Sequence, residues 1–418
     1  MTKRILLYSP DVIGHPRVYC RVIDDALAPY DCERVLAMGF TDEIGFAESP
    51  DLHPLASRER VHLVDNRTRS ATARPHLTAE ELVSLQREFA VDTTLFIEAD
   101  KSNDELRRIA AGDAPRLLGR NLGIFAKTAE WYPGEDSFTG APLRFVAPTL
   151  RTTLGNVKRA IFERQKSPWW FYERVILGAR VLDEIFTKDE RLSKWYGPPV
   201  YWMPEIARPA ESEETDADRS EHADTKADLE RFLAANSGRE PVLYFGDAAF
   251  YKGYDLFLDF VVRTPSACAL HPGRTYDAEN ARLFDRDVEA LRSRLRSEGR
   301  LFETNRYVHS HRLKALFFGA IRLYITTHRL ALSSSTVVQA AELGKPMLVP
   351  DRGLLGHRVR TSGIGAVYRY GDLEDLQRKA EQLWASDLSR FQEPARRFWA
   401  RFSDDAVRDF FVERLLRR

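Results

Sequence analysis

Four consecutive hydroxyl side chains are the clearest sign of chemistry in this 418-residue chain. They follow the apolar run 323–325, which is typical of a buried parallel strand, and they precede an apolar stripe with helical spacing. Hydroxyl residues favour the start of a helix, where backbone N–H groups lack partners and attract anions. The segment therefore predicts a phosphate site formed by Ser333, Ser334, Ser335 and Thr336.

Lys252, which has Gly246 shortly before it and Gly253 directly after it, is the second candidate. Lys252 follows the expected strand 242–245 and the turn at Gly246, and Gly253 comes directly after it. Because Gly253 has no side chain to obstruct the approach, the ammonium of Lys252 can reach a diphosphate and stabilise charge that develops there. The alternative interpretation is a surface lysine at the start of a helix.

These two segments together resemble the nucleotide-sugar site of the glycosyl transferases group 1 family. The resemblance covers 241–368 well and the amino-terminal half in outline. It implies an α/β chain of GT-B architecture, with two Rossmann-like domains facing across a cleft and a C-terminal helix crossing back to the N-terminal domain. The residues that carry it are Val242-Leu243-Tyr244-Phe245-Gly246, Lys252-Gly253-Tyr254-Asp255-Leu256, the hydroxyl run and Gly344-Lys345-Pro346.

The resemblance also implies an activity and a set of donor contacts. A retaining, metal-independent glycosyltransferase (hexosyltransferase-like) would move a sugar from a nucleoside-diphosphate sugar to a hydroxyl acceptor, without a further cofactor. Lys252 would act in catalysis by stabilising the departing nucleoside diphosphate. For His271, at the end of the expected strand 267–270, a structural role is the alternative. The donor-binding residues would be Gly246, Lys252, His271, Ser333, Ser334, Ser335, Thr336 and Gln339.

Three positions depart from the family pattern. Ala331 and Gln339 stand where the family has two glutamates. Gln339 can still hydrogen-bond a ribose, whereas Ala331 cannot hydrogen-bond the sugar. Either His328 or Arg329 could hold the sugar, the donor could be unusual, or catalysis could be lost. Asp247 stands where an arginine commonly pairs with the lysine, which calls for a compensating arginine. The candidates are Arg306, Arg329 and Arg352.

Candidate residues of the first half lie at the ends of its expected strands. Gly14 and His15 follow the first strand, where a glycine lets a ligand approach the backbone. Glu98 and Asp100 follow the expected strand 94–97. Either acid could orient an acceptor hydroxyl or act as a base, and helix capping is the alternative.

The pattern of elements predicts four regions. They are an N-terminal Rossmann-like acceptor domain (1–205), an acidic linker (206–240), a C-terminal Rossmann-like nucleotide-sugar domain (241–395) and terminal helices packing back on the first domain (396–418). Within the first, the basic and aromatic segment 151–172 could hold an anionic or lipid-linked acceptor or rest on a membrane surface. Its alternative is a helix with its aromatic side chains in the core.

The composition narrows the class of protein. Lys and Arg number 62, as do Asp and Glu, so no net charge attracts nucleic acid. The scattered Cys20, Cys32 and Cys268 favour reduced thiols in the cytoplasm, and no apolar run has the length of a membrane span. No metal site is expected, since Asp285-Arg286-Asp287 falls in a predicted charged helix, 277–298, with its acids in water.

The sequence thus predicts a cytoplasmic glycosyltransferase whose acceptor is a glycan, a lipid-linked molecule or a small molecule, with peripheral membrane contact left open. Two alternatives remain. One is a non-catalytic GT-B-like protein that binds a nucleotide or glycan as the partner of an active enzyme, and the other is a sugar-nucleotide epimerase. The donor's base and sugar, the acceptor and the oligomeric state are not predicted.

Overall fold

The protein divides into two compact units in a computed structural model. One unit contains strands β1 to β7 together with the C-terminal segment from Phe402, and the other contains the chain from helix α8 to Arg401. The residues that the structure describes are 2–10, 15–40, 52–72, 75–125, 179–206, 216–275, 283–306, 308, 311–329 and 333–416.

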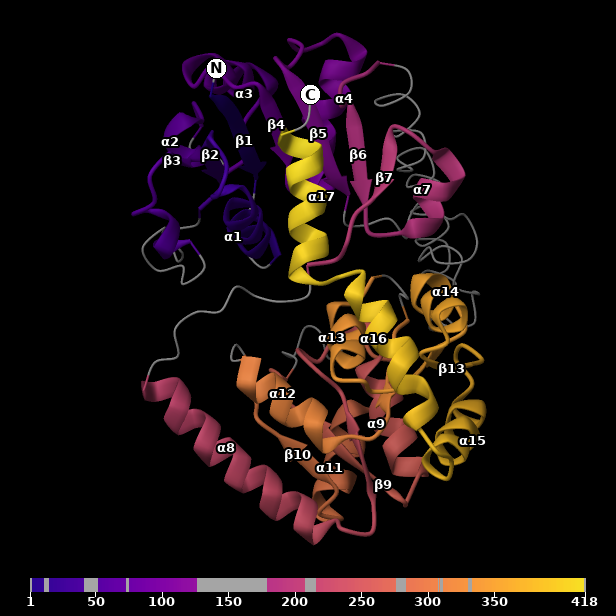
Figure 1. The fold of residues 1–418 in the computed structure, drawn as a ribbon. Coiled ribbons are helices and arrows are strands. Elements are labelled where there is room, and N and C mark those ends of the chain that lie inside the picture. Colours follow the sequence, from indigo (N-terminus) through magenta and orange to yellow (C-terminus); the bar gives the residue numbers. More distant parts are fainter. Residues whose placement is uncertain are drawn as a thin grey trace, which may run out of the picture. The chain divides into compact units, whose positions relative to one another are not determined.

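A seven-stranded parallel sheet forms the first unit, in the order β3-β2-β1-β4-β5-β6-β7 (Figure 1). Its central strand is buried from Ile5 to Ser9, as expected for a strand that is covered on both faces. The strands are β1 (Lys3–Ser9), β2 (Cys32–Met38), β3 (Val61–Asp65), β4 (Thr93–Phe96), β5 (Arg120–Phe125), β6 (Glu184–Thr187) and β7 (Val200–Trp202).

Helices connect these strands in alternation, which produces the parallel order. Thr78 begins one of them with a capping box. The Thr78 hydroxyl accepts a hydrogen bond from the backbone N–H of Glu81, and the Glu81 carboxylate accepts one from the backbone N–H of Thr78. The helical segments are α1 (His15–Leu27), η1 (His53–Leu55), α2 (Asn66–Arg69), α3 (Ala79–Glu88), η2 (Ala99–Ser102), α4 (Asn103–Ala111) and α7 (Glu190–Tyr196).

The second unit repeats this alternation around two three-stranded parallel sheets, β10-β9-β8 and β11-β12-β13, whose inner strands β8 and β11 are in contact. The strands are β8 (Glu240–Leu243), β9 (Ala267–His271), β10 (Leu301–Glu303), β11 (Tyr324–Ile325), β12 (Met347–Pro350) and β13 (Gly365–Tyr368). The helical segments are α8 (Asp216–Ala235), η6 (Phe250–Lys252), α9 (Tyr254–Arg263), α11 (Val288–Ser297), α12 (His311–Ala320), α13 (Ser335–Glu342), α14 (Gly353–Ser362), α15 (Leu373–Trp384), η7 (Ser389–Phe391) and α16 (Gln392–Ala400).

The last helix, α17 (Asp404–Leu416), returns to the first unit and packs against α1 (Figure 1). Val407, Phe411 and Leu415 are buried in the same core as residues of β1 and β2. By contrast, α16 packs on α13 within the second unit, so the chain changes unit between Arg401 and Phe402. The crossing C-terminal helix that the sequence predicted is confirmed.

The α/β fold with two Rossmann-like parallel units is also confirmed. The acidic segment, whose composition is typical of a linker or of an exposed helix, contains the 20-residue helix α8, which contacts α12. One local expectation differs from the structure. The predicted charged helix 277–298 is wrong in extent, because Asp287 caps α11 and the helix begins at Val288. The basic and aromatic segment 151–172 lies outside the described residues.

Candidate functional site

The segments after β8 and β9 bring three glycines and a lysine together. Gly246 has a φ of 91°, and a side chain there would place its Cβ 3.0 Å from Nζ of Lys252. A Cβ on Gly273 would lie 2.1 Å from the carbonyl oxygen of Gly246, and one on Gly253 would lie 2.1 Å from that of Thr327. These contacts leave no room for side chains, so the loops after β8, β9 and β11 meet closely.

Lys252 ends η6 and lines a small cavity at the carboxyl ends of β8 and β11. Its Nζ forms no hydrogen bond or ion pair with any residue that the structure describes. Burial lowers the pKa of Lys252, and the charge of Asp247 offsets this only in part. An ammonium without a counter-ion at hydrogen-bond distance attracts anions strongly, because a bound anion would offset the free-energy cost of removing the ammonium from water.

Two further polar atoms in this cavity wall lack hydrogen-bond partners among the described residues. They are Oγ1 of Thr326 and Nδ1 of His328, and both atoms are buried. Burial and the nearby charge of Lys252 lower the pKa of His328 to about 3, so its ring is neutral near pH 7. Buried polar atoms without partners are costly in a protein interior, and a ligand that supplies the missing bonds would remove the cost.

The hydroxyl run lies at the start of α13 and is connected to this cavity. Ser334 precedes the helix with extended backbone, and its side chain does not cap the helix. Its Oγ lies 2.8 Å from Oγ1 of Thr336, which accepts a hydrogen bond of 2.8 Å from the cavity residue Tyr324. Gln339 is buried one turn further along, and Ser333 and Ser335 are half-buried.

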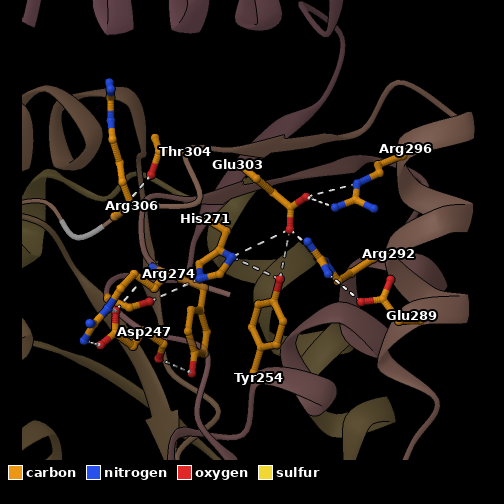
Figure 2. Close-up of polar contacts among 12 residues, drawn as sticks. Asp247, Tyr254, His271, Arg274, Glu289, Arg292, Arg296, Glu303, Thr304 and Arg306 are labelled. Carbon is orange, nitrogen blue, oxygen red and sulfur yellow. Dashed lines mark hydrogen bonds and ion pairs between the residues drawn. The ribbon is translucent and has the colours of Figure 1, made fainter. Parts of the chain in front are cut away.

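His271 is fully buried at the end of β9, and its ring faces protein groups on both sides (Figure 2). Nε2 donates to the carbonyl oxygen of Gly246 over 3.1 Å, since a carbonyl can only accept, and Nδ1 lies 3.0 Å from the Tyr254 hydroxyl. That hydroxyl is 3.3 Å from Glu303, which binds Arg292 and Arg296 at 2.9 and 2.7 Å. His271 therefore supports the loop after β8 through the carbonyl oxygen of Gly246.

Asp247 is paired with an arginine that the sequence did not single out. Figure 2 shows Arg274 folded over the Asp247 carboxylate, with Nη2 2.6 Å from Oδ2. The three arginines that the sequence offered as compensating cations have other partners in the described part of the chain. Arg329 binds Asp255 through two contacts of 2.7 Å, Arg306 donates to Thr225, and Arg352 stacks on Tyr370.

The two aspartates of the formal Asp-x-Asp pattern are exposed, as expected, and they also have structural roles. Asp285 accepts a hydrogen bond of 2.7 Å from Arg329, Arg286 binds Asp259 at 2.7 Å, and Asp287 caps α11. In the described part of the chain, no three His, Cys, Asp or Glu side chains gather as a metal site would require.

The first unit places its candidates at the carboxyl ends of its own strands. Glu98 is 8% exposed and has a φ of 55°, a strained backbone for a non-glycine residue, and it pairs with Lys101 at 2.5 Å. Asp100 lies in η2, and His15 begins α1. Gly14 lies outside the described residues.

The sequence did not indicate a role for Lys188, a buried lysine that interacts with the charge of Glu98. Lys188 follows β6, lies 3.8 Å from Glu205 and sits over the ring of Tyr19. Burial would lower its pKa, but the charges of Tyr19, Glu205 and Glu98 outweigh burial and raise it. The hint in the sequence was its position directly after the strand-ending Thr187.

Comparisons with known proteins agree on the architecture. No family model matches the chain, and no curated protein matches it by sequence. Sucrose-phosphate synthase from Thermosynechococcus elongatus is similar in structure, with a TM-score of 0.62 and 13% identity over 100% of this chain and 98% of that one. HepE from Anabaena, solved in complex with UDP and glucose, has a TM-score of 0.59 and 12% identity over the whole of both chains.

A third similar structure is the UDP-GlcNAc 2-epimerase from Neisseria meningitidis bound to UDP-GlcNAc, with a TM-score of 0.53 and 11% identity over the whole of both chains. Together these likenesses establish that the chain has the fold of the GT-B glycosyltransferases. The three cysteines are free and buried, and no helix in the described ranges has the length and apolarity to cross a membrane.

Proposed function

We propose that this protein is a glycosyltransferase that uses a nucleoside-diphosphate sugar as donor and a hydroxyl group as acceptor. One observation carries the proposal: the Lys252 ammonium has no described counter-ion at bonding distance, and it shares a cavity wall with the unpartnered polar atoms of Thr326 and His328. This combination suits an anionic, oxygen-rich ligand. Its place at the carboxyl ends of parallel strands is where α/β sheets bind nucleotides.

Each part of the site has a role in such a transfer. The bond from the sugar carbon to the diphosphate breaks, the diphosphate leaves with the electron pair, and a bond forms from that carbon to the acceptor oxygen. Lys252 would stabilise the charge on the leaving diphosphate, and the N–H groups at the start of α13 would bind its oxygens. Gly246 would let the phosphates approach the backbone. Retention of configuration and independence of metal are part of this proposal.

The acceptor would bind in the first unit. Glu98 or Asp100 would orient the acceptor hydroxyl or take its proton. His328, neutral near pH 7, is the best candidate to contact the sugar, because Arg329 is already bound to Asp255 and Asp285. The acceptor would be a glycan, a lipid-linked molecule or a small molecule.

Calorimetry with UDP, GDP, ADP, TDP and CMP, followed by product analysis with the donors of the nucleotide that binds, tests the proposal. A glycosylated acceptor supports it. Conversion of the donor into an isomer would instead identify an epimerase, the second candidate, which the likeness to the UDP-GlcNAc epimerase favours. Binding without conversion of donor would point to a non-catalytic nucleotide-binding protein, and no binding would overturn all three.

A further inference from the structure

Asp247 stands between two cations at the end of β8. Its carboxylate accepts three hydrogen bonds from Arg274, from the backbone N–H at 3.2 Å, from Nε at 3.1 Å and from Nη2 at 2.6 Å. Burial would raise the pKa of Asp247, but these bonds and the charge of Lys252 outweigh burial and lower it. The carboxylate is therefore ionised at neutral pH and stands beside the site proposed for a diphosphate.

The backbone that carries these residues is fixed. Gly246 donates to the carbonyl of Pro272 over 3.2 Å, and Ala248 donates to the carbonyl of Arg274 over 3.0 Å. The close approach of Gly273 to Gly246 locks the two loops together. The Arg274 side chain, however, is 63% exposed, so its guanidinium can rotate to another partner while the loops stay in place.

We propose that Asp247 is a resident counter-ion that a nucleoside diphosphate displaces: on binding, Arg274 leaves the Asp247 carboxylate and binds the terminal phosphate beside Lys252. The inference rests on the proposed function, because it requires a diphosphate at Lys252. A phosphate carries more charge than a carboxylate and offers a third oxygen, so it is the stronger partner for a guanidinium. Asp247 repels the same phosphate and thereby limits how tightly the nucleotide is held.

A double-mutant cycle tests this exchange. Dissociation constants of UDP, GDP and ADP are measured by calorimetry at one salt concentration for the wild type, Asp247→Asn, Arg274→Gln and the double variant. Circular dichroism checks that each is folded. Glu240 and Arg322, joined at 2.8 Å, form a matched exposed pair near the other end of β8, and Glu240→Gln and Arg322→Gln are the controls.

For the nucleotide that the wild type binds, we expect Asp247→Asn to tighten binding about tenfold, and Arg274→Gln to weaken it about tenfold in the Asp247→Asn background. The comparison in the Asp247→Asn background is decisive, because Arg274 no longer neutralises a carboxylate in that variant. If Arg274→Gln leaves the affinity of that variant unchanged, Arg274 only pairs with Asp247 and does not bind the nucleotide. This result would overturn the inference while the proposed function stands. If the wild type binds no nucleoside diphosphate, the proposed function and the inference both fail.

Discussion

His271 donates a hydrogen bond of 3.1 Å from Nε2 to the carbonyl oxygen of Gly246, and this bond joins a buried network to the candidate phosphate loop. The network continues through the Tyr254 hydroxyl to Glu303. Because every member is enclosed by the second unit, the loop that precedes Lys252 is held by the core of that unit. Preorganisation of this kind lets a binding site act without a cost of reordering when the ligand arrives.

Replacement of Glu303 by glutamine should destabilise the second unit. Burial would raise the pKa of Glu303, but the nearby His271 ring and the hydrogen bonds from Arg292 and Arg296 lower it from 4.5 to about 2. A carboxylate whose pKa is lower in the folded than in the unfolded protein stabilises the fold at any pH above its unfolded pKa. This stabilisation is lost as the pH falls toward about 2, the pKa in the folded state. At pH 7 we expect Glu303→Gln to lower the free energy of unfolding by about 2 kcal/mol.

Urea unfolding between roughly pH 7 and pH 2.5 measures the effect, and the difference between variant and wild type should shrink below about pH 4.5. Glu289 pairs with the same Arg292 but is 59% exposed. Glu289→Gln should therefore change stability by less than about 0.5 kcal/mol, which makes it the control. An equal loss in both variants would contradict a special role for the buried carboxylate.

A methyl group at Gly273 should disturb the loop after β8. Its Cβ would lie 2.1 Å from the carbonyl oxygen of Gly246, and neither backbone can yield without breaking the bonds between the loops. We expect Gly273→Ala to cost at least about 2 kcal/mol in thermal unfolding. Gly319, in α12, has nothing within 4 Å of a Cβ, so Gly319→Ala should be neutral or stabilising by about 0.5–1 kcal/mol. A neutral Gly273→Ala would show that the loops are not tightly packed.

The sequence was sufficient to predict the fold and the segments that surround the candidate donor site. Strands, glycine turns and the helix start at Ser335 have short-range signals, namely apolar runs, breakers and hydroxyls. Lys252 was found because Gly253 follows it directly and the turn at Gly246 lies close before it in the chain. The assignments of Lys252, the hydroxyl run and Gln339 to a donor remain predictions, as do those of Glu98 and Asp100 to an acceptor.

Ion pairs between residues on different loops could not be predicted from the sequence. Arg274 follows a different strand from Asp247, and the pairing depends on the register of β8 and β9. Arg329 looked available in the sequence, but the fold places it against Asp255 and Asp285. The sequence shows which charged residues are present and how far apart they lie in the chain. Which of them form ion pairs depends on the tertiary structure.

Substitutions of His328 should separate stability from function. Its Nδ1 is buried and has no hydrogen-bond partner in the described part of the chain, so it costs stability in the free protein. We expect His328→Leu to keep or raise the melting temperature while it lowers turnover at least about tenfold. His328→Asn keeps a polar atom near the position of Nδ1 and should retain more activity. Full activity of the leucine variant would exclude a contact with the donor.

Removal of one aromatic ring from α17 should destabilise the first unit. Phe411 is fully buried in the core that α17 shares with α1, whereas Arg408 of the same helix is nearly half-exposed. Phe411→Ala should lower the free energy of unfolding by about 3–5 kcal/mol, and Arg408→Ala by less than about 0.5 kcal/mol. Denaturant unfolding followed by tryptophan fluorescence measures both. Equal effects would show that α17 is not an integral part of that core.

The ionisation of Lys252 should govern how nucleotide binding depends on pH. Because burial lowers its pKa below 10.5, the ammonium loses its proton at a lower pH than an exposed lysine does. A diphosphate needs the charged form, so affinity should fall as pH rises through that lowered pKa. Lys252→Ala should bind at least about tenfold more weakly at pH 7 and lose this alkaline limb, while Lys226→Ala, on the exposed face of α8, should match the wild type.

Lys252→Arg provides the sharper comparison, because a guanidinium stays charged at any pH at which the protein is folded. If the ammonium acts through its charge, the arginine variant should retain part of the affinity, and that affinity should not decline between roughly pH 8 and pH 10. Calorimetry across this range, with the nucleoside diphosphate that binds the wild type, gives both curves. The same alkaline decline in the arginine variant would show that a group other than Lys252 titrates in this range, which would contradict the prediction.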